Sequence, residues 1–258
     1  MIKAVGSGDL YGLKEGDRVV YWGGEGGYAE YNTASAAKMT AIPADIELDV
    51  AAAATMQGLT ALTMIEEAYA VQKGDWILVH AAAGGTGQML CNLLRVKGAH
   101  TIATASSEAK LELAKAAGAE VLINYSTGGW KQKVLEVTGG EGVHAVFDGV
   151  GKDTFNDDLE VIRRKGTLVS FGSASGAVEP FLIAKLSLKN IKLLRPNAMN
   201  YVYTPEEYQH YMKEFFSLLL DGKIPKPKFT VYDLKDTKQA QDDLAGRKTT
   251  GKLLLKCS

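Results

Sequence analysis

Residues 73–97, KGDWILVHAAAGGTGQMLCNLLRVK, constrain the possible fold more than any other stretch of the sequence. The apolar run Trp76–Ala82 shows no polar alternation, which is typical of a strand buried on both faces of a parallel sheet. A glycine-rich turn, Ala83–Gly87, follows at once, and the residues after it repeat leucine at the i, i+3, i+4 spacing of an amphipathic helix. This order of strand, turn and helix predicts an α/β protein whose turn approaches a bound phosphate group.

The turn has the register Ala82-x-Gly84-x-x-Gly87, so alanine replaces the first glycine of the G-x-G-x-x-G pattern. Glycines let the backbone approach a pyrophosphate, and the following helix directs unpaired N–H groups at it. The other expected contact positions are Ala83, Gly85 and Thr86. A strand-to-helix turn of an α/β protein without a nucleotide is the alternative. We expect a bulky residue at Gly84 or Gly87 to abolish nucleotide binding while the fold largely survives.

Strand and helix patterns alternate after this turn. This alternation predicts right-handed crossovers and a doubly wound parallel sheet, the Rossmann arrangement of an α/β protein. The expected strands are Thr101–Ala105, Val121–Tyr125, His144–Phe147, Leu168–Phe171 and Ile191–Leu194. The expected helices are Glu108–Ala117, Trp130–Val137 and one with Phe155, Leu159 and Ile162 on its apolar face.

The flanking parts of the chain have a different pattern. Short β-like runs at Asp17–Tyr21 and Tyr28–Tyr31 predict a small β domain, followed by a helical stretch, Ala51–Ala70, that Gly58 interrupts. Past Pro196 the expected elements are a helix that starts at Thr204-Pro205 and runs to Asp221, strands Phe229–Leu234 and Leu253–Lys256, and a helix Thr237–Ala245. We place domain boundaries so that the parts are residues 1–57, 58–195 and 196–258.

The overall charge excludes some classes of partner. Lys plus Arg number 29 and Asp plus Glu number 30, so no global field attracts the chain to nucleic acid or to an anionic membrane. Cys91 and Cys257 form no C-x-x-C or Cys/His cluster, and a disulfide framework or a structural zinc site is not expected. We find no apolar segment near 20 residues and no secretory leader, which predicts a cytoplasmic protein without membrane contact.

Five ordered motifs carry a resemblance to a known family: Gln57–Thr60, Ala81–Gly87, Asp148–Gly151, Val169–Gly172 and Arg195-Pro196. With them the chain resembles the zeta-crystallin-like quinone oxidoreductases, on the zinc-free side of the medium-chain dehydrogenase/reductase superfamily. The resemblance implies a GroES-like catalytic domain, a Rossmann domain that binds NADPH, and a homodimer. It also implies reduction of quinones or related electrophilic carbonyl compounds. Residues 1–57 resemble only the second half of the GroES-like domain, so we expect a chain that binds NADPH and reduces quinones poorly.

Cofactor choice depends on the end of the second strand. An NAD enzyme usually carries an acidic residue there, whereas this sequence has Ser106 and Ser107, with Glu108 opening the next helix and Lys110 close by. Small hydroxyls near a lysine suit a 2′-phosphate, which predicts NADPH over NADH. The alternative is that Lys110 is a solvated helix lysine.

Further cofactor contacts are implied by the resemblance. Tyr125 matches a tyrosine against the adenosine phosphate, Thr60, Phe171 and Ser173 match positions along the ribose and nicotinamide, and Arg195 and Arg247 match arginines near the cleft. Each has a structural alternative. Tyr125 and Phe171 are also plausible packing residues, Thr60 a hydroxyl at a helix entry, and the arginines surface ion-pair partners.

The remaining polar residues do not form a catalytic group. His80 and His144 lie on apolar strands without clustered partners, so we interpret them as hydrogen-bonded core residues. Asp148 is expected to cap the turn after its strand. No catalytic residue and no metal ligand is assigned.

A second functional class remains open, because some members of this family bind RNA or serve as lens proteins. An AU-rich RNA-binding protein regulated by the nucleotide would need a basic stripe with aromatic residues. The sequence has a few short basic clusters, such as Arg163–Lys165 and Lys223–Lys228, and near-neutral net charge argues against strong RNA binding. For the quaternary structure, the apolar edge strand Ile191–Leu194 predicts pairing of two copies around a two-fold axis.

Overall fold

The computed structural model of the protein describes residues 1–23, 26–246 and 251–257. The chain forms two compact units, which we call the sheet unit, Thr60–Tyr201, and the terminal unit, Met1–Leu59 with Val202–Ser258. The sheet unit is one continuous stretch, while the terminal unit combines both ends of the chain. The domain boundaries expected after residues 57 and 195 stay predictions.

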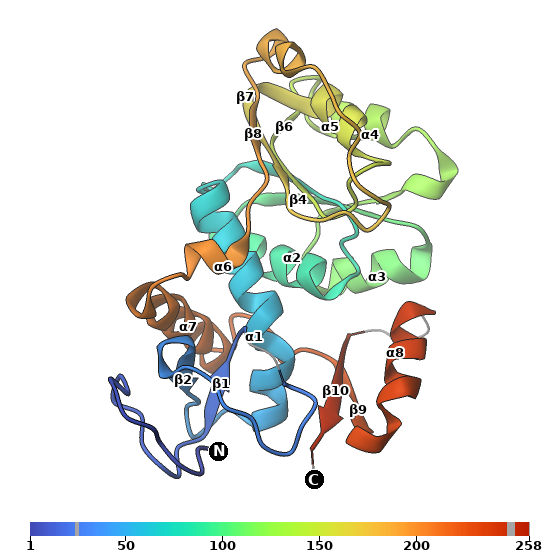
Figure 1. Cartoon of the computed structure of the whole chain (residues 1–258). Helices are drawn as coiled ribbons and strands as arrows, with labels where there is room; N and C mark the ends of the chain where they lie inside the picture. Colours follow the sequence, from blue (N-terminus) through green and yellow to red (C-terminus); the bar gives the residue numbers. More distant parts are fainter. Residues whose placement is uncertain (24–25, 247–250, 258) are drawn as a thin grey trace. The chain divides into compact units, whose positions relative to one another are not determined.

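The sheet unit contains a six-stranded sheet with the strand order β5-β4-β3-β6-β7-β8, in which every neighbouring pair is parallel (Figure 1). The strands are β3 (Trp76–Val79), β4 (His100–Ala105), β5 (Val121–Asn124), β6 (Val143–Asp148), β7 (Ile162–Ser170) and β8 (Lys192–Leu194). The helices are α2 (Gly85–Lys97), α3 (Glu108–Ala116), α4 (Trp130–Val137), α5 (Phe155–Val161) and α6 (Ala198–Tyr201), with shorter turns η2 (Met64–Ala68), η3 (Tyr125–Thr127) and η4 (Ile183–Leu188). This arrangement confirms the predicted doubly wound α/β fold.

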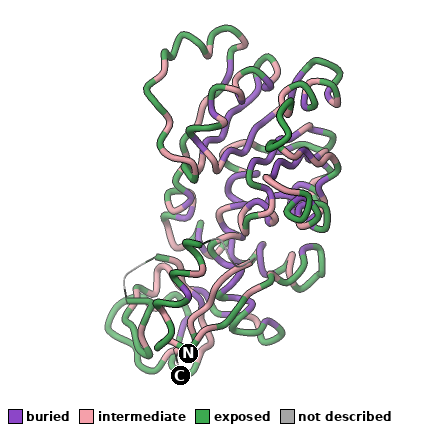
Figure 2. Tube along the Cα trace, turned by 90° about the vertical axis from the view of Figure 1, so that its right-hand side faces the viewer, coloured by how far each residue is buried: buried purple, intermediate pink, exposed green. Residues whose placement is uncertain are grey.

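Helices cover both faces of this sheet, α2 and α3 one face and α4 and α5 the other (Figure 1). The central strands are therefore mostly buried, and Figure 2 shows buried residues gathered in the interior of the sheet unit. The strand order reverses at β3, whose neighbours are β4 on one side and β6 on the other. In open parallel sheets, ligands bind outside the carboxyl ends of the strands at such a reversal.

Several predicted boundaries shift in the sheet unit. The helix Trp130–Val137 is confirmed at both ends, and Gly118 follows the end of α3 with φ 105°, as a C′ glycine should. Tyr125 and Phe171 lie just past β5 and β7, not inside them. Ile162 was expected on a helix face and instead begins β7, where its buried side chain joins the hydrophobic core that includes Val134 of α4 and Phe155 of α5.

The terminal unit is built from short strands and three helices. Its elements are β1 (Val19–Tyr21), η1 (Ala36–Lys38), β2 (Met39–Ala41), α1 (Leu48–Thr63, which continues into the sheet unit), α7 (Pro205–Leu220), β9 (Phe229–Asp233), η5 (Leu234–Asp236), α8 (Thr237–Ala245) and β10 (Lys252–Lys256). Strands β1 and β2 pair antiparallel, and β9 and β10 pair parallel. Helix α7 starts as predicted: the Thr204 hydroxyl accepts from the Glu207 N–H, and the Glu207 carboxylate accepts from the Thr204 N–H.

Two predictions for the terminal unit are wrong. Residues Tyr28–Tyr31 form bends and belong to none of the strands in the described part of the chain. Gly58 does not interrupt its helix, since α1 runs through it without a break. A Cβ at Gly58 would overlap the Phe215 ring of α7, so glycine is needed here for helix packing.

The combined helix of α1 and η2, Leu48–Ala68, is 21 residues long and apolar enough to cross a membrane by length and composition. The expectation that no apolar segment approaches this length is therefore wrong. In its most apolar window 67% of the residues are buried inside the protein. The apolar composition of this helix is therefore explained by its burial in the core.

Candidate cofactor site

The glycine turn lies between β3 and α2 at the carboxyl edge of the sheet. Ala81 has a positive φ of 50°, and its carbonyl accepts from the Gly84 N–H at 2.9 Å, which closes the turn. Gly84 is the N-cap of α2, and no described side chain caps the helix there. The first N–H groups of α2 have no acceptor within the helix, so they are available to an anion.

The two outer glycines of the motif have different roles. A Cβ at Gly87 would lie 2.5 Å from the Ala81 carbonyl oxygen and 2.7 Å from the Ala82 Cα, whereas a Cβ at Gly84 would lie 3.3 Å from the same oxygen. Gly87 is required for close packing of α2 on the turn. The expectation that the fold tolerates a bulky residue at Gly87 is therefore wrong, because the obstructing atoms belong to the backbone.

The end of β4 brings two predicted residues together. The Lys110 ammonium group donates to the Ser106 hydroxyl at 3.1 Å, and both side chains are accessible. Ser107 is the N-cap of α3 and accepts from the Lys110 N–H. The nearby Glu108 carboxylate accepts from the Asn124 amide at 3.0 Å. Hydroxyl groups and a cation thus lie where an NAD enzyme places a carboxylate.

Tyr125 belongs to the adjacent strand end. It opens η3 and its side chain is 44% exposed. Its neighbour Ser126 donates its hydroxyl proton to the Ser106 carbonyl at 3.0 Å, which joins the ends of β4 and β5. Ser126 was missed from sequence, although a hydroxyl directly after Tyr125 at a strand end was a usable signal.

The loops after β6 and β7 pack against each other. Asp148 Oδ1 accepts from the N–H groups of Val150 (2.7 Å) and Gly151 (3.2 Å) and from the Thr154 hydroxyl (3.0 Å), which confirms the predicted cap. A Cβ at Gly149 would lie 3.1 Å from the Phe171 ring, and one at Gly172 would overlap the Gly149 backbone. Glycine at both positions allows this close approach of the two loops.

Arg195 links the loop after β7 to the strand beside it. Its guanidinium donates to the Ser170 carbonyl at 2.7 Å and to the Ser173 hydroxyl at 3.3 Å. Both acceptors are uncharged, and through these two hydrogen bonds Arg195 holds Ser173 in place. Phe171 and Ser173 follow β7, so they share the carboxyl edge of the sheet with the glycine turn.

Thr60 and Arg247 are the remaining predicted residues. Thr60 is near the end of α1, and its carbonyl accepts from the Thr63 hydroxyl at 3.2 Å. Its alternative interpretation as a helix-entry hydroxyl is wrong, because α1 begins 12 residues earlier at Leu48. Arg247 lies outside the described residues.

His80 is a hydrogen-bonded core residue, as predicted, whereas His144 is hydrogen-bonded but only partly buried, with its side chain 26% exposed. His80 contacts Thr104 and Asp158, and His144 accepts from the Trp76 N–H at 2.9 Å. Across the described ranges, 1–23, 26–246 and 251–257, no group of three or more His, Cys, Asp or Glu side chains could hold a metal ion.

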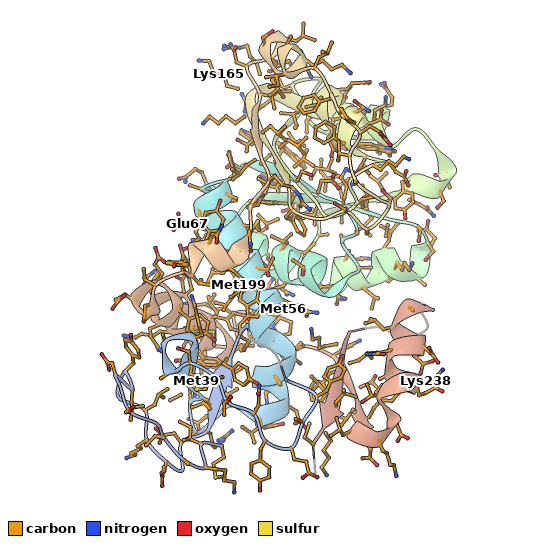
Figure 3. The ribbon with its side chains drawn as sticks, viewed as in Figure 1. Met39, Met56, Glu67, Lys165, Met199 and Lys238 are labelled. Carbon is orange, nitrogen blue, oxygen red and sulfur yellow. The ribbon has the colours of Figure 1, made fainter. Side chains whose placement is uncertain are left out.

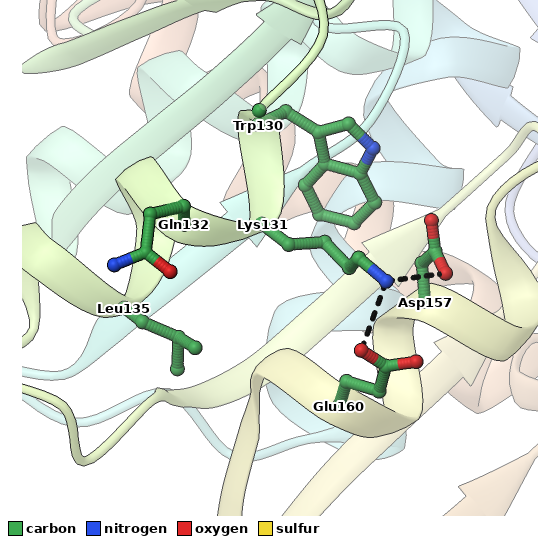
Figure 4. A pocket seen from close by; sticks show the side chains of 7 residues that line it. Trp130, Lys131, Gln132, Leu135, Asp157 and Glu160 are labelled. Atoms are coloured by element: carbon green, nitrogen blue, oxygen red, sulfur yellow. Dashed lines mark hydrogen bonds and ion pairs between the residues drawn. The ribbon is translucent and has the colours of Figure 1, made fainter.

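A surface groove lies between α4 and α5 (Figure 4). None of its lining residues belongs to the glycine turn. Its central lysine, Lys131, forms ion pairs with Asp157 and Glu160, both at 2.9 Å. Trp130 and Leu135 supply its apolar wall. Because Lys131 is already paired with two carboxylates, it offers little counter-charge to the phosphates of a nucleotide.

Comparison with known proteins gives consistent results. The family described as "Zinc-binding dehydrogenase" matches residues 85–217. A "Probable quinone oxidoreductase" of Schizosaccharomyces pombe is 40% identical over all of this chain and 78% of its own length. A "2-haloacrylate reductase" of Burkholderia is 32% identical over 89% of this chain and 70% of its own length. The solved structure of Escherichia coli quinone oxidoreductase complexed with NADPH superposes with a TM-score of 0.90 and 36% identity, over 95% of this chain and 76% of that one.

Proposed function

We propose, since this chain belongs to the quinone oxidoreductase family, that it reduces quinones or related electrophilic carbonyl compounds with NADPH. The observation that carries the cofactor choice is the Lys110–Ser106 pair at the end of β4, where an acidic residue would select NADH. The family relative from E. coli was solved with NADPH. The relative described as a 2-haloacrylate reductase supports the wider class of electrophilic acceptors.

Three parts of the proposed cofactor site can be given separate roles. The uncapped start of α2 would hold the pyrophosphate with backbone N–H groups, and Lys110 would neutralise the 2′-phosphate. Tyr125 would contact the adenosine side of the cofactor. The full proposed set is Thr60, Ala83, Gly84, Gly85, Thr86, Gly87, Ser106, Lys110, Tyr125, Phe171, Ser173 and Arg247.

When bound, NADPH supplies the hydride, so the protein does not need to supply a nucleophile. Its task is to orient the acceptor and to keep water out of the site. The chain contributes by holding the phosphates rigidly through the turns after β3 and β4. The Phe171 loop is fixed by Asp148 and Arg195 through backbone contacts. Its position at the sheet edge suits it to line the nicotinamide side of the site.

Calorimetry with NADPH and NADH tests the proposal. Wild-type protein should bind NADPH at least about tenfold more tightly than NADH, a difference of about 1.4 kcal/mol. Lys110→Ala should remove most of that preference. Lys115→Ala is the matched control, since Lys115 lies on the same helix and its ammonium group is 3.8 Å from the Glu112 carboxylate. Equal affinities for both nucleotides, or an unchanged preference in Lys110→Ala, would contradict the assignment.

Turnover is tested by the loss of NADPH absorbance with a panel of quinones and with a 2-haloacrylate. We expect oxidation of NADPH with at least one quinone. A chain that binds NADPH and oxidises it with none of these acceptors would refute quinone reduction while leaving the cofactor assignment intact.

We also propose that two copies pair along β8. This strand lies at the edge of the sheet, and the preceding segment exposes Leu182, Ile183 and Leu188 by 73%, 77% and 85%. Lys165, in the neighbouring strand, points away from the sheet into solvent (Figure 3). Light scattering should give a dimer, and Ile183→Asp should give a monomer with an unchanged fold, because the side chain is exposed. A monomeric wild-type protein at micromolar concentration would contradict pairing.

RNA binding is the weaker functional candidate. In the basic clusters named from sequence, Arg163 contacts His144, Lys223 pairs with Asp221 at 3.2 Å, and Lys226 pairs with Glu47 at 3.0 Å. Because Lys223 and Lys226 are already paired with carboxylates, they contribute less charge to phosphate binding. We retain the enzyme as the proposed function, with the cytoplasm as its proposed location.

A further inference from the structure

The His80 side chain joins three segments of the sheet unit. His80 directly follows β3 and precedes the glycine turn by three residues. Its Nδ1 lies 2.8 Å from the Thr104 hydroxyl of β4, and its Nε2 lies 2.7 Å from Asp158 Oδ1 of α5. Asp158 is 78 residues away from His80 in the sequence.

This cluster is fully enclosed. His80 is 3% exposed, and Thr104 and Asp158 are 0% exposed. The Trp130 ring lies edge-on to the imidazole at a centroid distance of 5.0 Å. Side chains that are held this firmly by packing and hydrogen bonds keep one rotamer, so they transmit position accurately.

His80 and Asp158 are two hydrogen-bonded ionisable groups in a fully buried site. Burial raises the pKa of Asp158 to about 6, against the opposing attraction of His80. Burial alone would lower the pKa of the imidazole, but Asp158, Asp148 and Asp157 together raise it. Among the described residues no partner reaches Asp158 Oδ2, so its link to His80 is the main stabilising contact of this carboxyl group.

Thr104 leads to predicted phosphate contacts, and Asp158 leads to the loop after β6, which packs against Phe171. Thr104 is two residues before Ser106, and its carbonyl accepts from the Ala82 N–H in the glycine turn at 3.1 Å. Asp158 lies one helical turn after Thr154, whose hydroxyl donates to Asp148. The turns after β3, β4 and β6 are thus connected through one imidazole.

We propose that His80 is a positioning residue for the cofactor: by joining Thr104 and Asp158 it fixes these three turns as a single cofactor-binding surface, with the phosphates at the turns after β3 and β4. The inference rests on the proposed binding of NADPH. His80 does not touch the cofactor in this scheme. Its loss would let the turns separate slightly, and small displacements of binding groups cost affinity without removing any contact residue.

The test uses variants that keep one bond and remove the other. In His80→Asn the amide nitrogen takes the place of Nδ1 and retains the Thr104 contact. In His80→Gln it takes the place of Nε2 and retains the Asp158 contact. We expect the Kd for NADPH by calorimetry to rise about tenfold in each variant. We expect KM for NADPH to rise as well, with kcat at saturating NADPH and KM for the quinone unchanged, because only uniform cofactor binding is lost.

A matched control separates positioning from general stability. His144 also has both ring nitrogens in contact with neighbours, but it lies near the amino end of β6, away from the glycine turn. His144→Gln should lower the melting temperature and leave NADPH affinity unchanged. An equal loss of NADPH affinity in His144→Gln would overturn the inference.

Substitutions at Thr104 keep the test decisive if the His80 variants do not fold. Thr104→Ser retains the hydroxyl and should bind NADPH as the wild type does, whereas Thr104→Val removes only the hydroxyl and should weaken binding. Equal affinity in the two Thr104 variants, or wild-type affinity in folded His80→Asn and His80→Gln, would overturn the inference. Failure of the wild-type protein to bind NADPH would instead refute the proposed function.

Discussion

Gly87 gives a quantitative test of the difference between the two glycines of the turn. A Cβ at this position would lie 2.5 Å from the Ala81 oxygen, whereas ordinary contacts begin at 3.4 Å, so α2 and the turn must separate by about 0.9 Å. Overpacking costs about 1–3 kcal/mol, and alanine in a helix recovers about 0.5–1 kcal/mol relative to glycine. Because the obstructing atoms are backbone and cannot rotate away, we expect Gly87→Ala to destabilise the sheet unit by about 2 kcal/mol.

Gly84→Ala is the paired measurement. Its Cβ would lie 3.3 Å from the same oxygen, and φ −70° with ψ 166° is an ordinary conformation for alanine. We expect a stability change within about 0.5 kcal/mol, together with weaker NADPH binding, because the methyl group lies where the pyrophosphate approaches.

Urea unfolding followed by tryptophan fluorescence measures the stabilities, since Trp76 and Trp130 both lie in the sheet unit. Calorimetry with NADPH measures the affinities. If Gly87→Ala were as stable as wild type, the close approach of α2 to the turn would be wrong. If Gly84→Ala retained full affinity, the turn would not be the pyrophosphate site.

Two further predictions concern stability. Gly58→Ala should cost about 1–3 kcal/mol because its methyl group overlaps the Phe215 ring, and Phe215→Leu in the same chain should recover part of that loss; additive effects in urea unfolding would contradict the contact. The pKa of His144 is lowered by burial and by Arg163, so the unfolded chain binds a proton below pH 6.5 that the native chain does not, and this side chain's contribution to stability should fall as pH drops below 6.5. Asp158 has the opposite effect, because its raised pKa favours the native state at low pH. The difference in the free energy of unfolding between wild type and His144→Gln isolates the contribution of His144, because Asp158 is present in both proteins. If this difference does not change with pH, the prediction is refuted.

The sequence predicted correctly those elements whose conformation depends on residues close together in the chain. The capping box of Thr204 and Glu207 fixes the start of α7, and the helices Trp130–Val137 and Thr237–Ala245 have their predicted ends. Alternating strands and helices predicted the sheet because each pattern is local and repeated. The Lys110–Ser106 pair was predictable for the same reason, as its partners lie four residues apart.

Contacts between distant segments were not predictable in this way. The role of Gly58 depends on Phe215, which lies 157 positions later, and no rule of helix propensity contains that information. His80 was correctly interpreted as a core residue, but its partner Asp158 could not be named from the sequence. Tyr28–Tyr31 had strand-like composition, but a strand also requires a neighbouring backbone to bond with.

The continuity of the sheet unit has a consequence for biosynthesis. Residues 60–201 form all six parallel strands from one uninterrupted segment, whereas α7, whose Phe215 packs at Gly58, is translated well after α1. During synthesis β3 therefore has an open edge until β6 is available, since β6 completes the pairing on its other side. The terminal unit must wait longer still, with its apolar helix α1 uncovered in the meantime. The order of folding follows from topology: the nucleotide-binding sheet first, then closure of the terminal unit by the last part of the chain.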